Sequence, residues 1–315
     1  MVPLLPALTA AEYTAAHPRT GLWLPALQEI ARRHGLEGTS TRFGDGTMVV
    51  FAVGAHHVVK LYPPHCANKY VCERAALARI QGRVDFATPE LVAEGEVDGW
   101  PYLVMTRLRG VPIDKVWGQL SEAERLRLAS AAGEAVARLH ALPLENLQPL
   151  AVEWGGFIQR QSVRCVERQR SQGVAESWLD QIPEYLESTR AHFPSRFAAV
   201  LLHTELGPGH LYLVERAGRW ELEGLIDFAD AMVGHPEYDF AAVGLFITRG
   251  DPRWLRAFLL AYGYAPGELT PALRERLMAY TLLHRYSNLR WYLEQVPPPP
   301  ATRTLARLAM DWWSF

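Results

Sequence analysis

Hydrophobic residues in the first hundred positions follow a strand pattern with two helical interruptions. Runs rich in β-branched and aromatic residues are separated by the turn dipeptides Asp45-Gly46 and Asp98-Gly99, which are typical of hairpins. Apolar residues recur at helical spacing over 21–36 and 67–80. The pattern predicts a leading helix and an antiparallel sheet interrupted by one helix. The strands are expected at 39–43, 47–53, 57–62, 90–97 and 101–108.

After Gly110 the pattern changes to helical spacing. Ser121 and Glu124 predict a helix start, because the hydroxyl caps a backbone N–H and the carboxylate reaches back. Thr270-Pro271 predicts another start, and the polar insert 154–193 is also expected to be helical. Three apolar runs are expected to form short strands, at 199–202, 211–215 and 222–228.

This order of elements predicts an α+β fold of two lobes, because strands come first and helices follow. We expect an antiparallel-sheet lobe with one helix in residues 1–106. A mainly helical lobe is expected in residues 107–315.

Composition and charge narrow the class of protein. The 315 residues are 49% hydrophobic and 21% charged, which excludes disorder as the main state. With 32 basic and 34 acidic residues the net charge is −2, so a nucleic-acid backbone is not an expected partner. No apolar run approaches the roughly 18 residues of a membrane span, and residues 1–17 lack a signal-peptide pattern, so we expect a cytoplasmic protein. Three cysteines give no disulfide framework: Cys66, Cys72 and Cys165.

Lys60 is the first candidate for chemistry. It lies in the apolar run Val58–Leu61, where an ammonium group is costly unless it is paired. Glu73, in the helix expected at 67–80, could supply that pair. Considered alone, Lys60 fits better as a strand-end lysine whose ammonium reaches water.

The segment from His203 to His210 is the second candidate. It follows an apolar run, contains Glu205, and has a Gly-Pro-Gly turn at 207–209 that would display the flanking side chains. An ordinary polar turn between strands explains the same residues about as well.

The third candidate is the apolar strand Gly224–Phe228, in which Asp227 comes near the end. An aspartate at a strand end forms caps and turns. It is also the kind of ligand that Mg²⁺ takes beside phosphate oxygens.

Together the three candidates supply what phosphoryl transfer requires: a lysine for the phosphates, a carboxylate to hold it, a base and metal ligands. They stand in the chain order of the protein-kinase fold. From about Thr39 onward the sequence resembles the aminoglycoside phosphotransferase and choline kinase-like family of that fold. Residues 203–210 match its His-Gly-Asp-x-x-x-x-Asn, Ile226–Asp230 its Ile-Asp-Phe/Trp-x-Asp, and Tyr238-Asp239 its Tyr-Asp-Leu/Phe-Ala. Gly99–Met105 is closest in pattern to hygromycin B phosphotransferases.

The resemblance implies a role for each matching residue. Lys60 would contact the α- and β-phosphates of ATP, with GTP as the other candidate, and Glu73 would orient it. Asp227 would bind Mg²⁺. His203 and Asp239 would brace the catalytic loop.

Further residues would hold the nucleotide. Gly44 and Gly46 would form the turn over the phosphates, although a lone Gly-x-Gly is a weak signal. Met105 would lie behind the adenine, and the backbone of Thr106 and Leu108 would bind its edge.

Two positions that carry a chemical role in the family depart from its pattern. Glu205 stands where the family has its catalytic Asp, and His210 where it has a magnesium-binding Asn. Glutamate keeps the carboxylate and adds a methylene, so Glu205 is still expected to act as the base. An imidazole is a less suitable ligand for magnesium than an oxygen, so His210 is expected to hold metal, metal-bound water or phosphate.

The family binds its acceptor with the insert before the catalytic loop and with the C-terminal helices. Residues 145–196 hold seven acids and six arginines, a near balance that counts against a strongly polycationic acceptor. Four of the acids are spaced to share one face of one helix, where they would attract such an acceptor: Glu176, Asp180, Glu184 and Glu187. A solvated helix face is the alternative. Asp230 is also expected to contact the acceptor. Aromatic rings that could stack on a sugar, or simply fill the core, are Trp154, Trp178, Trp254, Trp291 and Tyr292.

The sequence therefore predicts an ATP-dependent phosphotransferase that phosphorylates an alcohol group of an aminoglycoside or aminocyclitol. One alternative is a catalytically impaired nucleotide-binding protein of the same fold. Another is a kinase for choline, homoserine or a nucleoside. A protein kinase is disfavoured, because 227–239 is too short for an ordinary activation loop. We expect no nucleic-acid, membrane or protein partner.

Overall fold

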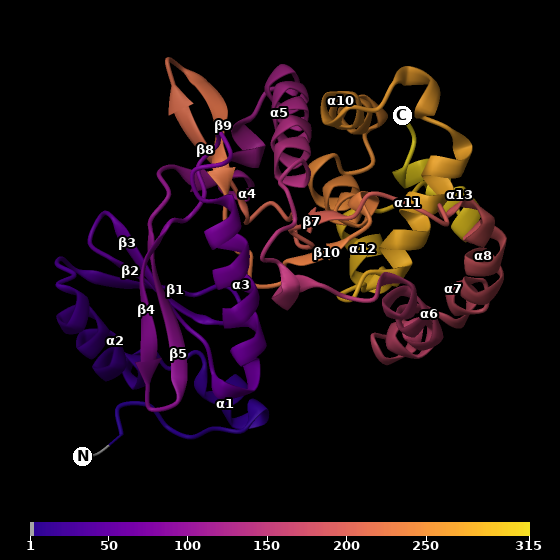
Figure 1. Ribbon diagram of the computed structural model, residues 1–315. Coiled ribbons are helices and arrows are strands. Elements are labelled where there is room, and N and C mark those ends of the chain that lie inside the picture. The colour runs from indigo at the N-terminus through magenta and orange to yellow at the C-terminus, as the bar shows by residue number, and fades with distance from the viewer. Residues whose placement is uncertain (1–2) are drawn as a thin grey trace. The chain divides into compact units, whose positions relative to one another are not determined.

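A computed structural model describes residues 3–315 and divides them into two compact units (Figure 1). The sheet unit runs up to Arg109 and also contains Asn146–Leu150 and Glu223–Ala231. The helical unit contains the remaining segments, Gly110–Glu145, Ala151–Leu222 and Met232–Phe315. A boundary placed at one position, such as residue 106, cannot include the two later segments that return to the sheet unit.

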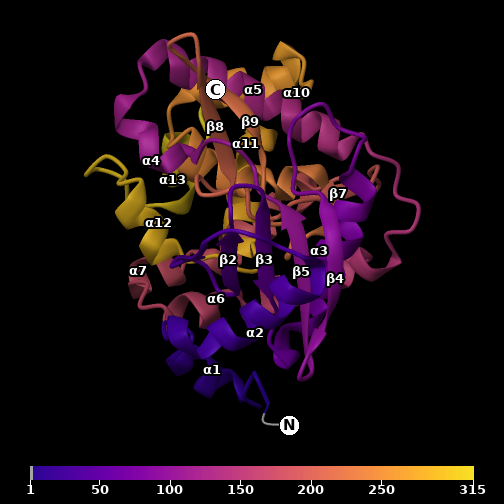
Figure 2. The same cartoon turned by 90° about the vertical axis from the view of Figure 1, so that its left-hand side faces the viewer.

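The sheet unit is built on five strands in the order β1-β2-β3-β5-β4, with every neighbouring pair antiparallel. Figure 2 shows β2, β3, β5 and β4 following one another across the sheet. The strands are β1 (Ser40–Phe43), β2 (Val49–Val53), β3 (His57–Leu61), β4 (Leu91–Val97) and β5 (Trp100–Thr106). The predicted strands and both predicted turns are confirmed, and Asp98 and Gly99 both adopt positive φ, as a tight hairpin turn requires.

Three helices accompany this sheet: α1 (Ala10–Ala16), α2 (Thr20–His34) and α3 (Ala67–Ile80). The leading helix and the helix at 67–80 were predicted, whereas α1 was not. Seven residues are too few for periodicity to show, but the capping box of Thr9 and Glu12 marks the start of α1.

The alternation of side chains along β3 assigns one helix to each face of the sheet. Val59 and Leu61 pack in a core cluster with Trp23 and Leu27 of α2. Successive strand side chains point to opposite faces, so Lys60 points to the other face, where it meets α3. In Figure 1, α2 and α3 accordingly lie on opposite sides of the strands.

The helical unit contains ten helices among the described residues, together with short strands. The helices are α4 (Ile113–Val116), α5 (Glu122–His140), α6 (Trp154–Ser171), α7 (Glu176–Leu179), α8 (Ile182–Thr189), α9 (Phe240–Ala242), α10 (Pro252–Tyr262), α11 (Pro271–Leu283), α12 (Leu289–Gln295) and α13 (Leu305–Trp312). The strands are β6 (Val111–Pro112), β7 (Val200–Leu202), β8 (Leu211–Arg216), β9 (Arg219–Leu225) and β10 (Met232–Gly234), and β9 runs on into the sheet unit. The capping box at Ser121 and the helix start at Thr270-Pro271 are both confirmed.

The elements agree with the predicted α+β class. Strand β7 pairs antiparallel with β10, and the loop that follows β7 carries the second candidate segment. None of the helices in residues 3–315 has both the length and the apolar character that a bilayer crossing requires.

Candidate active site

Lys60 is the centre of a buried ion cluster in the sheet unit. Its residue is only 5% exposed, and its ammonium lies 2.6 Å from a carboxylate oxygen of Glu73 and 2.8 Å from one of Asp227. The hydroxyl of Tyr62 donates to the same oxygen of Glu73, at 2.5 Å. The cluster therefore holds one cation between two carboxylates from distant parts of the chain.

The cluster keeps Lys60 charged. Burial disfavours an ammonium ion, but Asp227 and then Glu73 outweigh that effect, so the pKa of Lys60 is raised. Burial raises the pKa of Glu73, and Lys60 opposes this rise. A permanently charged lysine beside a carboxylate pair is suited to hold phosphate oxygens.

Asp227 is brought to Lys60 by a short backbone pairing within the sheet unit. The N–H of Ala87 donates to the carbonyl of Glu223 at 2.8 Å, and the N–H of Leu225 donates to the carbonyl of Ala87 at 3.0 Å. Gly224 makes this approach feasible, because a Cβ there would collide with the carbonyl oxygen of Ala87.

The residues around Asp227 are constrained as well. Asp227 itself adopts φ +68°, a conformation that aspartate tolerates better than most residues. Its side chain is 36% exposed, whereas Asp230 is buried and pairs with Lys69 at 2.6 Å. Contact of Asp230 with the acceptor stays a prediction.

The other nucleotide-site candidates lie on the strands of the sheet unit and the turns beside them. Met105 pairs in register with Val58 on β3, which places it on the same face as Lys60. Thr106 ends β5, and Leu108 follows it, half-buried. Gly44 and Gly46 lie in the exposed turn between β1 and β2. Their contacts with a nucleotide stay predictions.

In the helical unit, the loop after β7 is held by Asp239. One carboxylate oxygen accepts the N–H of His203 at 2.8 Å and the other accepts the N–H of Thr204 at 2.6 Å. His140 donates from Nε2 to the same carboxylate, at 3.0 Å. Asp239 and His203 are fully buried. Asp239 thus fixes the backbone just before Glu205.

Thr204 adopts φ +71°, which is unfavourable for a β-branched residue. The family pattern has a glycine at this position, which adopts such a φ without strain. His284, at the end of α11, donates from Nε2 to the carbonyl of Thr204 at 2.8 Å, and its Nδ1 accepts the N–H of Tyr286 at 3.3 Å. These contacts require a neutral imidazole, and burial lowers the pKa of His284 to about 4. The strained backbone is therefore held from both sides.

Glu205 and His210 are joined through the backbone of the loop. The N–H of Glu205 donates to Nδ1 of His203 at 3.3 Å, and its carbonyl accepts from Nδ1 of His210. Glu205 is half-buried, and its charge adds slightly to the effect of burial that raises the pKa of Tyr292 to about 12.

Asp227 suits magnesium better than His210 does. Mg²⁺ is commonly held by one or two carboxylates together with substrate phosphates. Asp227 offers a carboxylate beside Lys60, the lysine that is expected to contact the phosphates. Among residues 3–315 no group of three or more His, Cys, Asp or Glu side chains could enclose a metal. Asp227 therefore fits a metal that the phosphates themselves help to bind.

The prediction that four acids share one helix is wrong. Glu176 lies on α7, which ends at Leu179, whereas α8 begins at Ile182 and carries Glu184 and Glu187. Pro183 is the physical reason, because it lacks an N–H and belongs to the first turn of a new helix.

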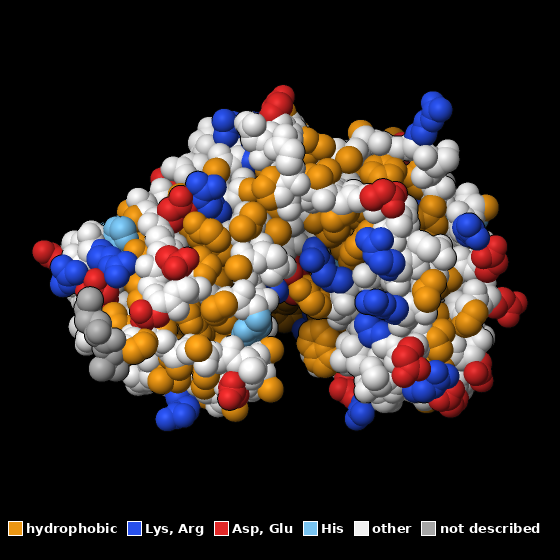
Figure 3. Space-filling view, turned by 60° about the horizontal axis from the view of Figure 1, so that its bottom comes forward, with side chains coloured by type: hydrophobic (Ala, Val, Ile, Leu, Met, Phe, Trp, Pro, Cys, Tyr) orange, Lys and Arg blue, Asp and Glu red, His pale blue; other side chains and the backbone are white. Residues whose placement is uncertain are grey.

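The charges of these acids are partly balanced by arginine. Glu176 pairs with Arg170 at 3.2 Å and Glu187 with Arg190 at 3.5 Å. In Figure 3, acidic and basic side chains are interspersed on the right-hand part of the face shown, without a continuous acidic area. Binding of an acceptor by Glu176, Asp180, Glu184 and Glu187 stays a prediction.

Four functional contacts were not anticipated from the sequence. They are made by Tyr62, Lys69, His140 and His284. His140 lies on the last turn of α5, and the apolar stripe of that helix is a signal that this face is buried. His284 follows the segment 277–283, which is apolar except for Thr281 and could have indicated a buried imidazole.

Known proteins resemble this chain over most of its length. Residues 40–277 match the model of a family described as the phosphotransferase enzyme family. Viomycin phosphotransferase of Streptomyces vinaceus is 24% identical over 230 residues, which is 63% of this chain and 73% of that protein. Lysine-specific demethylase JMJ21 of Arabidopsis thaliana is 24% identical over 205 residues, or 52% of this chain, but the chain spans only 21% of that protein.

A solved structure shows the same fold. The GDP complex of wild-type aminoglycoside 2'-phosphotransferase-IIIa superposes with a TM-score of 0.67 at 19% identity. The match covers 91% of this chain and 97% of that one. The kinase-like fold predicted from the sequence motifs is therefore confirmed.

Proposed function

Because the chain belongs to the phosphotransferase enzyme family, we propose that it transfers the γ-phosphate of a nucleoside triphosphate to a hydroxyl of an aminoglycoside or aminocyclitol. ATP is the expected donor, with GTP as the other candidate. The relative that is a viomycin phosphotransferase and the solved aminoglycoside phosphotransferase with GDP support an antibiotic acceptor and a nucleotide donor.

The ion cluster at Lys60 carries the proposal. A lysine held at 2.6 Å and 2.8 Å from two carboxylates has little structural purpose in a strand, because a buried ion cluster adds little net stability over apolar packing. It does suit phosphate binding, with Glu73 orienting the ammonium. Asp227 would hold Mg²⁺, which neutralises charge on the phosphates when it is bound.

Glu205 is proposed as the base that accepts the proton of the acceptor hydroxyl. Its backbone is fixed by the contacts of Asp239 and His284 to the two residues before it, so only its own side chain has to adapt. Positioning dominates phosphoryl transfer, so one added methylene is expected to tune the rate rather than abolish it.

Aromatic rings near Glu205 offer a surface for a sugar ring. Trp291 is 43% exposed and stands against Phe246, with ring centres 4.9 Å apart. The ring of Tyr292, whose pKa is raised mainly by burial and in small part by the charge of Glu205, lies next to the ring of Trp291. We propose that these rings take part in holding the acceptor.

The first test is consumption of ATP or GTP by the purified protein with a panel of acceptors. The panel contains hygromycin B and other aminoglycosides, together with viomycin, choline, homoserine and nucleosides. Turnover that depends on an aminoglycoside or aminocyclitol supports the proposal. Turnover only with choline, homoserine or a nucleoside would instead identify a metabolite kinase.

Substitution of Glu205 tests the mechanism. Glu205→Gln should retain nucleotide binding and lose most transfer, because the amide is similar in size but accepts no proton at neutral pH. Glu221→Gln, at an exposed acid of β9, is the matched control and should leave kcat unchanged. An active parent whose kcat is indifferent to Glu205→Gln would show that Glu205 is not the base.

A catalytically impaired protein of this fold is the second candidate, because Glu205, His210 and Thr204 all depart from the family pattern. Glu205→Asp distinguishes the two. If the loop is built for glutamate, the shorter side chain should lower kcat, since a displacement of ~1 Å can cost ~10²-fold. If glutamate impairs the protein, Glu205→Asp should raise kcat.

A further inference from the structure

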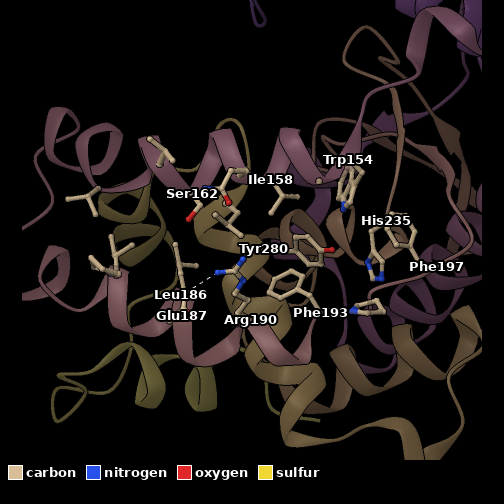
Figure 4. A pocket seen from close by; sticks show the side chains of 18 residues that line it. Trp154, Ile158, Ser162, Leu186, Glu187, Arg190, Phe193, Phe197, His235 and Tyr280 are labelled. Atoms are coloured by element: carbon tan, nitrogen blue, oxygen red, sulfur yellow. Dashed lines mark ion pairs between the residues drawn. The ribbon is translucent and has the colours of Figure 1, made fainter.

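The helical unit contains a cavity of about 510 Å³ that is lined by none of the residues proposed to hold the nucleotide or the metal or to act as the base, although the predicted acceptor residue Glu187 borders it. It lies against α6 and α8 and is bordered by the segment before β7, by His235 and by Tyr280 (Figure 4). This volume falls within the range of about 300–1,000 Å³ that is typical of sites for small molecules.

The cavity is separate from the catalytic loop. His235 directly follows Gly234, which pairs with Val200 at the start of β7, whereas the loop follows Leu202 at its other end. A strand of three residues, roughly 7–10 Å long, therefore stands between them.

The lining is mainly aromatic and aliphatic. Figure 4 shows Trp154, Phe193, Phe197 and Tyr280 around one end of the cavity and Ile158 along α6. Its two charged lining residues are paired with each other, since Glu187 lies 3.5 Å from Arg190. This balance gives no preference for a polycation or for an anion.

His235 is a polar group in this apolar lining. It is 95% buried, since only 5% of its surface is exposed, and its Nδ1 has no hydrogen-bond partner within residues 3–315. Burial lowers its pKa to about 4, so the imidazole is neutral at pH 7. A buried nitrogen without a partner is destabilising, and such groups are rare unless water or a ligand completes them.

A ligand satisfies His235 better than water does. A buried water is held by two to four polar partners. His235 instead stacks on Tyr280, with ring centres 5.5 Å apart, and contacts the edge of Phe197 at 4.8 Å. Flat aromatic surfaces beside the unpartnered nitrogen of His235 suit a ring system that carries a hydrogen-bonding group.

We propose that this cavity is a second binding site, for an uncharged, ring-bearing molecule whose carbonyl or hydroxyl group hydrogen-bonds His235. The proposal does not depend on the proposed phosphoryl transfer, and the lining offers no net negative charge for the polycationic acceptor expected there.

Nile red tests the site, because it is uncharged, has fused rings and carries a carbonyl group. The full chain should bind it saturably at one site, with a rise in fluorescence. Ser162→Trp should weaken binding more than tenfold by filling the cavity from α6. Ser177→Trp, an exposed position on α7 outside the lining, should bind as the parent does. His235→Phe keeps the ring but not the nitrogen and should weaken binding about fivefold to tenfold.

The controls keep the outcome unambiguous. Each variant is compared with the parent by melting temperature and by sedimentation. Absence of saturable binding to the folded parent, or equal binding to parent and Ser162→Trp, would overturn the proposal. A dimer that Nile red dissociates would also overturn it, by identifying a second copy of the chain as the occupant. Acceptor-dependent ATP turnover is measured separately and should be unchanged in Ser162→Trp.

Discussion

The sheet unit and the helical unit hold their candidate catalytic residues by different physical means. Around Lys60 the contacts are between charged side chains, which must be compensated because they are buried. Around Glu205 the contacts go to the backbone, through the carboxylate of Asp239 and the neutral imidazole of His284. The first arrangement fixes side chains and the second fixes a loop.

This difference explains where the sequence departs from its family. Lys60, Glu73 and Asp227 match the family pattern, and a change to Lys60 would leave the buried carboxylate of Glu73 without its cation. Glu205 and His210 do not match it, but their backbone is held by other residues. A loop fixed from outside tolerates new side chains, whereas an ion cluster does not.

The largest effect is expected from breaking the ion cluster. Lys60→Ala and Asp227→Ala should each lower kcat by ~10²–10³ or more, because each removes a group that acts on phosphate charge. The fold should survive Lys60→Ala, since the raised pKa of Glu73 allows that carboxyl to take a proton. Turnover with an accepted acceptor is measured beside the melting temperature. Near-normal turnover by either folded variant would remove the basis of the kinase assignment.

A smaller but still large effect is expected from weakening the hydrogen bonds between Asp239 and the backbone of the loop after β7. Asp239→Asn keeps one acceptor oxygen but places its amide NH₂ against one of the two N–H donors, that of His203 or that of Thr204, so kcat should fall about tenfold to a hundredfold. The free energy of unfolding should fall by about 1–3 kcal/mol. Asp251→Asn is the matched control, because Asp251 caps α10 with a backbone hydrogen bond at 2.9 Å. Asp251→Asn should lower the free energy of unfolding without changing kcat. Equal losses of kcat in the two variants would contradict the claim that Asp239 positions the loop that carries Glu205.

The two buried histidines His284 and His235 also predict a pH dependence of the free energy of unfolding. Burial lowers the pKa of His284 and of His235 to about 4, below the unfolded value of about 6.5. The unfolded chain therefore binds more protons between these values, and stability falls as pH falls from 6.5 toward 4. Each histidine should cost about 2 kcal/mol at pH 5. As pH falls from 7 to 5, the melting temperature of the parent should fall relative to that of His235→Phe, which has no imidazole at this position to protonate, and parallel curves would contradict the burial argument.

The smallest effect is expected from the acids of the insert. If the acceptor is a polycation, Asp180→Asn combined with Glu184→Gln should raise its KM by roughly twofold to fivefold, more at low salt. Glu176→Gln with Glu187→Gln should have less effect, because those acids already pair with arginines. If neither double variant changes KM at any ionic strength, these acids belong to a solvated surface and do not bind the acceptor.

The sequence predicts the strands, the main helices and the candidate chemistry because each rests on local spacing. Lys60 stands in an apolar run, and Asp227 ends another. The contacts of His140 and His284 could not be predicted in this way, because their partners lie far along the chain and no local pattern pairs them. The break between α7 and α8 could have been predicted from Pro183, but the regular spacing of the acids concealed it.

The return of Glu223–Ala231 to the sheet unit has a consequence for the order of events during synthesis. The sheet and its helices are complete once residue 109 has left the ribosome, yet the carboxylate of Asp227 comes more than a hundred residues later. Until then the buried Lys60 and Glu73 lack their third member, and Ala87 lacks the segment that pairs with it. The nascent chain therefore cannot assemble a functional phosphate-binding cluster before most of the helical unit has been translated. Because residues 203–210 precede Asp227 in the chain, the loop that carries Glu205 has already been synthesised when the cluster can form.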